Sequence, residues 1–433
     1  MTTTTIPQFE TADDRAIRRR TLTLALLTIV YFFSFMDRYI LTILLEMIKK
    51  DLHLTDTQLG LLQGFAFALL YATLGIPVAW LADRSNRRNI IAVSLAIWSA
   101  MTALSGLAQN FGQLLLCRVG VGIGEAGSSP PSHSIIADLY PPERRSAAMA
   151  IFTTGVVLGG GFGTMIGGTV AAIYGWRVAL AVIGLPGLVL ALIVRLFVVE
   201  PRRGLSEPAA KQLDDRPTLL DGARAMIANR AVVHLVAAVT VTSLVGYALA
   251  SFLPSLSQRS FGVSLLTVAL KLAPMIAIVG TVAGVVGGRI ADRAGQKYGT
   301  HVQPWVVAIG KSIAFPIVVV AYLSNDAVTA LGLMIVAYFF SSSYLGPTFS
   351  LIQGQSPIRM RAVWAALTLL MTNLIGLGIG PTLVGLLSDH VYQDYGKESL
   401  RYAMLTVELL TPWALFHYWR AGAALKRQHA VIE

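Results

Sequence analysis

The chain alternates long apolar runs with short polar segments from one end to the other. Apolar runs of twenty or more residues recur along its 433 residues, and about 20 such residues are enough for a helix to cross a bilayer. The pattern predicts an all-α membrane protein with twelve transmembrane helices. The predicted spans cover residues 21–48, 57–82, 89–108, 112–138, 146–173, 177–199, 231–257, 263–292, 303–323, 327–353, 361–388 and 402–424.

The basic residues test these spans, because the cytoplasmic loops of membrane proteins carry an excess of Lys and Arg. With the N-terminus inside, 24 of the 34 Lys and Arg fall in cytoplasmic segments, 6 on the opposite side and 4 within spans. Arg18 to Arg20 precede an apolar stretch that is too long for the core of a cleavable signal. We therefore expect both termini in the cytoplasm and the protein in the plasma membrane, the inner membrane of a bacterial cell.

Composition narrows the function further. The chain is 55% hydrophobic and 13% charged, whereas a soluble chain carries about 25% charged residues. The formal charge of +11 does not indicate a nucleic-acid partner, because the basic residues lie in alternate loops rather than on one face. A single cysteine, Cys117, excludes an intramolecular disulfide framework and a multi-thiolate metal site. No cofactor and no metal are expected. Membrane lipids are expected as partners, and the protein is expected to be a monomer.

The chain repeats weakly on either side of one long polar stretch. Two motifs recur in the same order, 209 and 215 residues apart. This predicts two six-helix halves, residues 1–199 and 231–433, joined by a cytoplasmic linker at residues 200–230, which is the plan of transporters built from parallel repeats. The paired segments are AWLADRSNRR (79–88) with GRIADRAGQK (288–297), and PPERRSAAMA (141–150) with SPIRMRAVWA (356–365).

The first pair of repeated segments places acids among arginines in tight cytoplasmic turns. An acid adds nothing to the positive-inside bias, but it can pair with an arginine or lie at the positive end of a neighbouring helix. We expect these turns to act as a cytoplasmic gate; the simpler alternative is that they only fix topology. The pattern resembles the G-x-x-x-D-R-x-G-R-R loop of the major facilitator superfamily. The residues concerned are Asp83, Arg84, Arg87, Arg88, Asp292 and Arg293.

We take four of the charges inside apolar spans as the functional centre. Asp37 and Arg38 are adjacent in the first span, and Arg118 and Glu125 lie seven residues apart in the fourth. Neighbours on a helix point about 100° apart, so Asp37 and Arg38 each need a partner on another helix. Counted from the cytoplasmic ends at about 1.5 Å per residue, Asp37 and Glu125 lie at similar depth, about 24 and 20 Å. Arg118 lies about 10 Å further outward, which places it better to meet Asp37, or to reach across to the other half, than to neutralise Glu125.

These charges predict proton coupling. A low-dielectric cavity favours the protonated form of a carboxyl group, and a nearby guanidinium favours the ionised form. A carboxyl group whose neighbour moves can therefore take up a proton on one side of the membrane and release it on the other. We assign proton coupling to Asp37 and Glu125, and substrate binding or ion pairing to Arg38 and Arg118. The alternative is a structural ion pair that joins the two spans.

Aromatic residues gather on spans one, seven and ten, among them Tyr39, Tyr247 and Tyr338. Core packing explains most of them. A cavity with apolar and aromatic walls, and with charges at one level, suits an amphipathic substrate. Glycines crowd the fifth span, from Gly155 to Gly168, and indicate close helix packing more than direct gating. Glu408, on a peripheral span, is expected to serve packing.

Several segments together resemble the Spinster family of the major facilitator superfamily, over nearly all of the first half. The resemblance implies alternating-access transport of lysophospholipids or sphingosine-1-phosphate-like anions. It gives Asp37 and Arg38 roles in gating and coupling, Arg118 a head-group or ion-pair role, and Glu125 a role in substrate and proton coupling. The segments are MDRY, ADRSNRR, RVGVGIGEA, IIADLYPPERRSAAMAIF and VVEPRRG.

We therefore predict a proton-coupled secondary active transporter of an amphipathic, lipid-like anion. Its partners would be this small-molecule or lipid substrate and protons. The alternative within the same fold is a proton-coupled carrier of small organic anions or drugs. An enzyme is not expected, because the sequence pairs no nucleophile with a base and has no metal-ligand spacing. A channel is disfavoured by the internal repeat.

Overall fold

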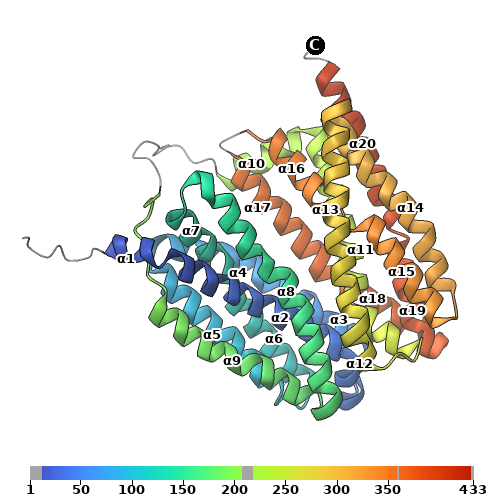
Figure 1. Cartoon of the computed structure of the whole chain (residues 1–433). Coiled ribbons are helices and arrows are strands. Elements are labelled where there is room, and N and C mark those ends of the chain that lie inside the picture. The colour runs from blue at the N-terminus through green and yellow to red at the C-terminus, as the bar shows by residue number, and fades with distance from the viewer. Residues whose placement is uncertain (1–11, 207–217, 358–359, 431–433) are drawn as a thin grey trace, which may run out of the picture.

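The computed structural model describes residues 12–206, 218–357 and 360–430, except for some side chains within these ranges, including that of Asp83. Every regular element in these ranges is a helix. Figure 1 shows the blue and green helices of the first 199 residues gathered on one side, and the yellow to red helices on the other. We call α2 to α9 the first-half helices and α11 to α20 the second-half helices. The domain boundaries themselves stay a prediction.

The first-half helices begin after a short helix, α1 (Ala12–Arg18). They are α2 (Arg20–Leu52), α3 (Asp56–Gln63), α4 (Phe65–Arg84), α5 (Arg87–Ser105), α6 (Phe111–Ala126), α7 (Ser129–Leu139), α8 (Pro142–Tyr174) and α9 (Trp176–Phe197).

A short helix, α10 (Leu219–Ala228), precedes the second-half helices. These include two π-helical stretches inside one span, η4 and η5. They are α11 (Arg230–Arg259), α12 (Leu265–Thr267), η1 (Val268–Leu272), α13 (Ala273–Tyr298), η2 (Thr300–Val302), α14 (Gln303–Leu323), α15 (Ala327–Ser341), α16 (Leu345–Gln355), α17 (Arg361–Met371), η4 (Thr372–Ile379), α18 (Gly380–Leu386), η5 (Leu387–Val391), η6 (Gln393–Glu398), α19 (Ser399–Glu408) and α20 (Thr411–Ala430).

Nine helices in the described ranges are long and apolar enough to cross a membrane. The other three predicted spans, the second, fourth and twelfth, are each occupied by two consecutive helices. The second span breaks at Gly64, whose ψ of −86° is not helical, and the fourth breaks before Pro130 and Pro131. Proline and glycine interrupt a helix because one lacks an N–H and the other is flexible. The count of twelve thus stays a prediction.

Glycines of α8 let it pack closely along α2. A Cβ atom on Gly159 would lie 2.2 Å from the carbonyl oxygen of Phe32, and one on Gly163 would lie 2.7 Å from that of Met36. Both contacts are too short for any side chain, so the two backbones touch directly. The glycine-rich span therefore serves tight packing inside the first half, as its sequence predicted.

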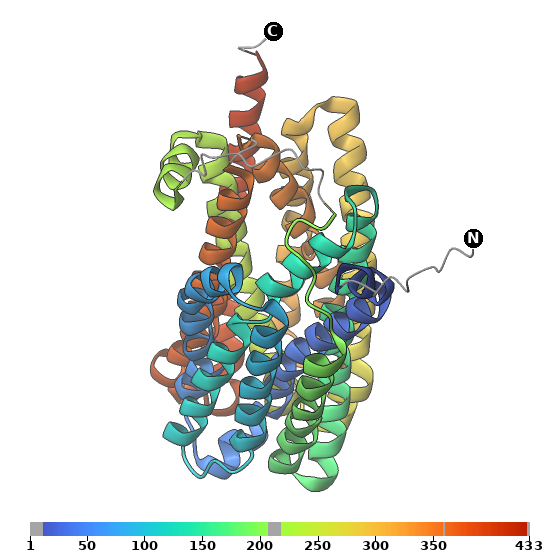
Figure 2. The same cartoon turned by 90° about the vertical axis from the view of Figure 1, so that its left-hand side faces the viewer.

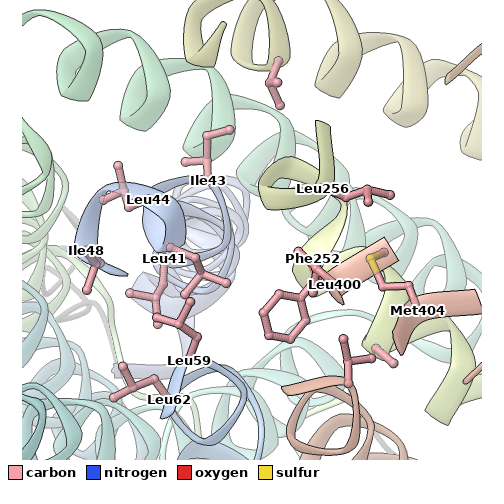
Figure 3. Close-up of a cluster of buried hydrophobic side chains, with 14 of the residues drawn as sticks. Leu41, Ile43, Leu44, Ile48, Leu59, Leu62, Phe252, Leu256, Leu400 and Met404 are labelled. Atoms are coloured by element: carbon pink, nitrogen blue, oxygen red, sulfur yellow. The ribbon is translucent and has the colours of Figure 1, made fainter. Parts of the chain in front are cut away.

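The two sets of helices share one apolar core at their outer ends, the side opposite α10 and the C-terminus. This cluster holds Met36 to Ile48 of α2 together with residues of α3, α11 and α19. At the same end, Gly60 of α3 lies so close to α18 that a Cβ atom would be 2.4 Å from the carbonyl oxygen of Pro381. The outer ends are therefore packed shut. Figure 3 shows members of this cluster: Leu41, Ile43, Leu44, Ile48, Leu59, Leu62, Phe252, Leu256, Leu400 and Met404.

Candidate functional site

The intramembrane charges meet between α2 and α6. Arg38 donates from Nε to Oε2 of Glu125 over 2.6 Å. Ser34, one turn before Arg38 on α2, donates its hydroxyl to the same oxygen over 3.0 Å. Positions four apart share a face of a helix, so α2 offers two donors to one carboxylate. Residue counting placed Asp37 and Glu125 at similar depth; the residue of α2 that contacts Glu125 directly is Arg38, next to Asp37.

Asp37 and Arg118 complete this charge cluster without a direct ion pair in the described structure. Asp37 is 1% exposed, and its Oδ1 has no hydrogen-bond partner among the described residues. Arg118 is 4% exposed, and its Nε likewise lacks a described partner. Asp37 nevertheless interacts electrostatically with both Glu125 and Arg118. Two acids and two bases therefore form one group with no net formal charge.

The prediction that Arg118 meets Asp37 rather than Glu125 stays a prediction. Arg118 interacts electrostatically with both carboxylates. Helix side chains tilt toward the N-terminus of their helix, so Glu125 leans back toward Arg118, two turns before it. Residue counting ignores this tilt, and it also missed that Arg38 is the group paired directly with Glu125.

The two carboxylates are also more enclosed than expected. Glu125 is 1% exposed, as is Asp37, so neither opens on water in this structure. The side chain of Arg38 is the exception in the cluster, with 20% of its surface exposed. Arg38 therefore stands between the buried acids and the accessible surface.

Aromatic rings surround the two guanidinium groups. The ring centroid of Phe67, at the start of α4, lies 4.8 Å from Cζ of Arg38 and 5.8 Å from Cζ of Arg118. Phe35 flanks Arg38 from α2 at 4.9 Å. A cation over a ring face gains about 0.5–2 kcal/mol when desolvated. Sequence reasoning missed both Ser34 and Phe67; only the four-residue spacing of Ser34 from Arg38 gave a signal.

A second polar group joins the two sets of helices at the outer end. Arg259, the last residue of α11, binds Asp56 at the start of α3 through two hydrogen bonds, Nη1–Oδ2 at 2.7 Å and Nη2–Oδ1 at 2.9 Å. Its Nη2 also lies 2.9 Å from Oε2 of Glu46 on α2. Lys49 adds a contact of 2.6 Å from Nζ to Asp56 Oδ1. We call Glu46, Lys49, Asp56 and Arg259 the outer ion cluster.

The outer ion cluster favours the ionised form of Asp56. Burial raises its pKa, but the hydrogen bonds and charge of Arg259, with the charge of Lys49, outweigh burial and hold the pKa well below its usual value. The cluster borders a cavity of about 630 Å³ on the outer side, which also exposes Lys50, His53 and Lys397. No sequence motif marked Asp56 or Arg259, since the two are joined only by the fold.

Asp389 of η5 also joins the two sets of helices at the outer end, through hydrogen bonds from backbone N–H groups. Its Oδ1 accepts a hydrogen bond from the backbone N–H of Asp56 over 3.1 Å, and its Oδ2 from that of Thr57 over 2.6 Å. These amides begin α3 and have no partner within their own helix. A second-half residue thus caps a first-half helix.

Two arginines of the predicted cytoplasmic gate, Arg87 and Arg88, have partners outside the second signature loop. Arg87 is fully buried and binds Asp138 of α7 and Oε1 of Glu200, the latter at 2.6 Å. Burial lowers the pKa of Arg87, but the hydrogen bonds to Asp138 and Glu200 outweigh burial, so the pKa is raised above its usual value. The backbone N–H of Arg88 donates to Glu200 Oε2 over 2.9 Å. Both arginines therefore hold the start of the linker to the first half rather than reach across to the second.

The other described residues of the two signature loops lie at the surface. Arg84, Asp292 and Arg293 are exposed. No ion pair of Asp292 or Arg293 is found within the described ranges. The prediction for Asp83 rests on a side chain outside the described ones, so the gating role of these loops stays a prediction.

No metal centre accompanies the charge cluster in the part of the chain that the structure describes. No three His, Cys, Asp or Glu side chains in those ranges are arranged to hold a metal ion.

Comparisons with known proteins match this architecture. The profile of the Major Facilitator Superfamily matches residues 27–393. An "MFS-type efflux pump" of Mycolicibacterium smegmatis is 33% identical over 417 residues, which cover 96% of each chain. A "Sphingosine-1-phosphate transporter SPNS2" of Danio rerio is 27% identical, over 86% of this chain and 78% of that protein.

A solved structure is similar over the whole fold. It is a crystal structure of a bacterial homolog of the human lysosomal transporter Spinster, in an inward-facing and unoccupied conformation. It superposes with a TM-score of 0.86 at 30% identity, and the alignment covers 94% of this chain and 98% of that one. The chain is thus a multi-pass integral membrane protein, and it belongs to the Major Facilitator Superfamily as a transporter of the Spinster type.

Proposed function

We propose that this transporter couples the movement of an amphipathic, lipid-like anion to protons by alternating access. The single observation that carries the proposal is the Arg38–Glu125 pair. It joins a fully buried carboxylate to a guanidinium that keeps a fifth of its side chain exposed. Removing an ion from water costs several kcal/mol, so a buried pair without other uses is expensive to keep. Residues of this kind inside a membrane usually serve transport.

Proton uptake is the first step in this proposal. A proton that binds Glu125 removes the negative charge that holds Arg38, and the Arg38–Glu125 contact weakens. Asp37 lies within electrostatic range of Glu125 and gains stability as an anion when Glu125 is neutral. Arg118 balances whichever acid remains ionised.

Substrate binding follows from the release of Arg38. A guanidinium without its carboxylate partner offers its N–H fork to a phosphate or carboxylate head group. Phe35 beside it and the half-exposed Tyr39 supply apolar surface for a chain attached to that head group. A lysophospholipid or a sphingosine-1-phosphate-like molecule has this form, and a relative carries the second name.

Alternating access requires the two halves, residues 1–199 and 231–433, to part at one end and close at the other. The outer ion cluster and the Gly60–Pro381 contact hold the outer ends together. We propose that residues 200–230 link the halves and that the signature loops hold the inner ends in the opposite state. Both termini then face the cytoplasm and the protein works as a monomer in the plasma membrane.

A second candidate substrate class has its own support. The 33% identity over 96% of an efflux pump favours small organic anions or drugs as cargo. The same charge cluster would couple their movement to protons. The acyl chain distinguishes the two candidates, since a drug carrier has no need of one.

Transport by purified protein in proteoliposomes tests the proposal. A labelled lysophospholipid or sphingosine-1-phosphate is supplied, with and without an imposed pH gradient. The wild type should accelerate transport when the gradient is present, and Asp37→Asn and Glu125→Gln should each lose this dependence. Glu408→Gln is the matched control, because Glu408 is also buried but lies on α19 outside the charge cluster; it should keep the gradient dependence.

The results separate coupling from cargo. An unchanged gradient dependence in both cluster variants would remove the coupling assignment. A series of substrates with shortened acyl chains identifies the cargo class. Uptake that is independent of chain length, together with uptake of small organic anions, would replace the lipid proposal by the second candidate.

A further inference from the structure

Helix α10 is joined to the membrane-spanning helix α11 by a corner of one residue. α10 ends at Ala228, α11 begins at Arg230, and Asn229 lies between them. The Asn229 side chain accepts hydrogen bonds from the backbone N–H groups of Ala231 and Val232, and Gln428 of α20 donates to it over 3.2 Å. The corner is therefore fixed by bonds from two helices. α10 must leave α11 at the depth where that span begins.

Two opposite faces of α10 have different surroundings. One face packs on the protein: a Cβ atom on Gly222 would lie 2.2 Å from Cγ1 of Val363, and Met226 belongs to a buried apolar cluster with Trp364. The opposite face leaves Leu220 59% and Ile227 73% exposed. These two residues are seven apart, so they lie on one stripe of the helix. Apolar side chains this exposed are costly in water.

Arginine completes the exposed stripe. Arg224 lies between Leu220 and Ile227 on the same face and is exposed, as is Arg230 at the corner. The acid on this helix, Asp221, accepts two hydrogen bonds from Thr218 and caps the first turn. In Figure 2 the yellow-green α10 projects sideways from the inner ends of the second-half helices. An apolar stripe with arginines, held across the bundle at its inner end, has the features of a helix that lies in a membrane surface.

We infer that α10 rests in the head-group layer of the inner side of the membrane, and that Arg224 and Arg230 bind the head groups of anionic phospholipids. Leu220 and Ile227 would reach the upper acyl chains. The match is one of charge and polarity: the guanidiniums meet phosphate while the apolar stripe leaves water. α10 also packs on α17, which continues into η4 beside α4. Bound lipid would thus anchor the inner part of the eleventh predicted span.

Site-directed fluorescence in vesicles tests this inference without any transport assay. The chain has one cysteine, Cys117, so a Cys117→Ser background allows a bimane label at Ile227→Cys. The protein is reconstituted in phosphatidylcholine with added nitroxide-labelled phosphatidylglycerol or nitroxide-labelled phosphatidylcholine. The label at 227 should be quenched by both lipids and more strongly by the anionic one. Arg224→Gln should reduce that preference about fivefold, the factor that corresponds to about 1 kcal/mol per arginine near a charged surface.

Two matched controls make the result decisive. Arg224→Lys keeps the charge and should retain most of the preference. A label at Gln296→Cys, exposed in the last turn of α13, should be quenched by iodide in the water and not by the lipids. Equal access of iodide to labels at 227 and 296 would overturn the membrane placement. A preference for phosphatidylglycerol that Arg224→Gln leaves unchanged would overturn head-group binding by this arginine.

Discussion

Arg38 and Glu125 meet across two helices, with 2.6 Å between Nε and Oε2, but they do not share the same environment. The Glu125 side chain has no exposed surface, whereas the Arg38 side chain keeps 20% of its surface exposed. Removing one partner of a fully buried pair costs about 3–5 kcal/mol, because the other charge stays buried and unpaired. In this pair only the Glu125 carboxylate is fully buried, so only the removal of Arg38 leaves a fully buried charge without its partner.

Replacing Arg38 should therefore destabilise the protein more than replacing Glu125. Arg38→Gln leaves a buried carboxylate, while Glu125→Gln leaves an arginine that can turn toward water. We expect a difference of about 2 kcal/mol, less than the full cost because Arg38 is partly exposed. Thermal unfolding of purified protein in detergent measures it. The double variant Arg38→Gln/Glu125→Gln should recover part of the loss; additive losses would contradict a direct coupling.

Neutralising Asp56 should let the outer ends separate. Asp56→Asn removes the anion that binds Arg259 and Lys49. Spin labels at His53→Cys and Lys397→Cys, in a Cys117→Ser background, report the distance across the outer cavity by double electron–electron resonance. We expect a longer and broader distance distribution. Asp51→Asn is the matched control, because Asp51 pairs with Arg177 inside the first half and should leave the distance unchanged. A shift of equal size in both variants would assign the effect to surface charge.

Mild acid should not open the outer ion cluster by itself. The pKa of folded Asp56 lies well below its usual value of 3.8. The stability that this ion pair contributes is thus present above pH 3.8, and it is lost only when the pH falls through the lower folded pKa. With Asp37→Asn and Glu125→Gln in place, the outer labels should keep one distance from about pH 8 to about pH 5. Separation of the labels in this range would make Asp56 a proton sensor.

Gly60→Ala should prevent full closure of the outer end. A Cβ atom there would lie 2.4 Å from the carbonyl oxygen of Pro381, which belongs to backbone and cannot swing away. Overpacking of this kind costs about 1–3 kcal/mol. Gly246→Ala on α11 is the control, since no atom lies within 4 Å of its added Cβ. The control should raise the unfolding midpoint slightly, because alanine favours a helix by about 1 kcal/mol over glycine. Equal midpoints for both variants would contradict the close contact.

Arg87→Gln should loosen the start of the linker. It leaves Asp138 and Glu200 near each other without the cation that joins them, at a cost of about 3 kcal/mol. Limited proteolysis of the linker, on the C-terminal side of Glu200, should become faster. The unfolding midpoint should fall. Arg144→Gln, an exposed arginine in the first turn of α8, is the control and should change neither. Unchanged proteolysis of Arg87→Gln would show that the linker is held by other contacts.

Sequence reasoning recovered the helices and the level of the charges, because both follow from distance along the chain. The apolar runs mark the spans, and the rise per residue puts Asp37 and Glu125 at one depth. It did not resolve which charges pair. Arg38 and Asp37 are adjacent, and only the rotation of α2 against α6 decides that Arg38 meets Glu125.

Contacts between distant segments were beyond the sequence. Asp56 and Arg259 are separated by 203 residues, and neither belongs to a repeated motif. Arg87 was placed in a gate by its motif, but its partners are Asp138 of the same half and Glu200 at the start of the linker. A motif identifies the residues of a loop, whereas the packing of whole helices selects their partners.

Because Asp389 caps the start of α3, the outer ends can part only if water replaces its carboxylate at the helix start. While the outer ends are joined, the amides of Asp56 and Thr57 donate to this carboxylate. When they part, water has to reach both N–H groups, since a helix start left dry and uncapped is unfavourable. Breaking ion pairs alone is therefore not sufficient to open this side. In the proposed alternating-access cycle, opening of the outer side therefore includes the entry of water between η5 and α3.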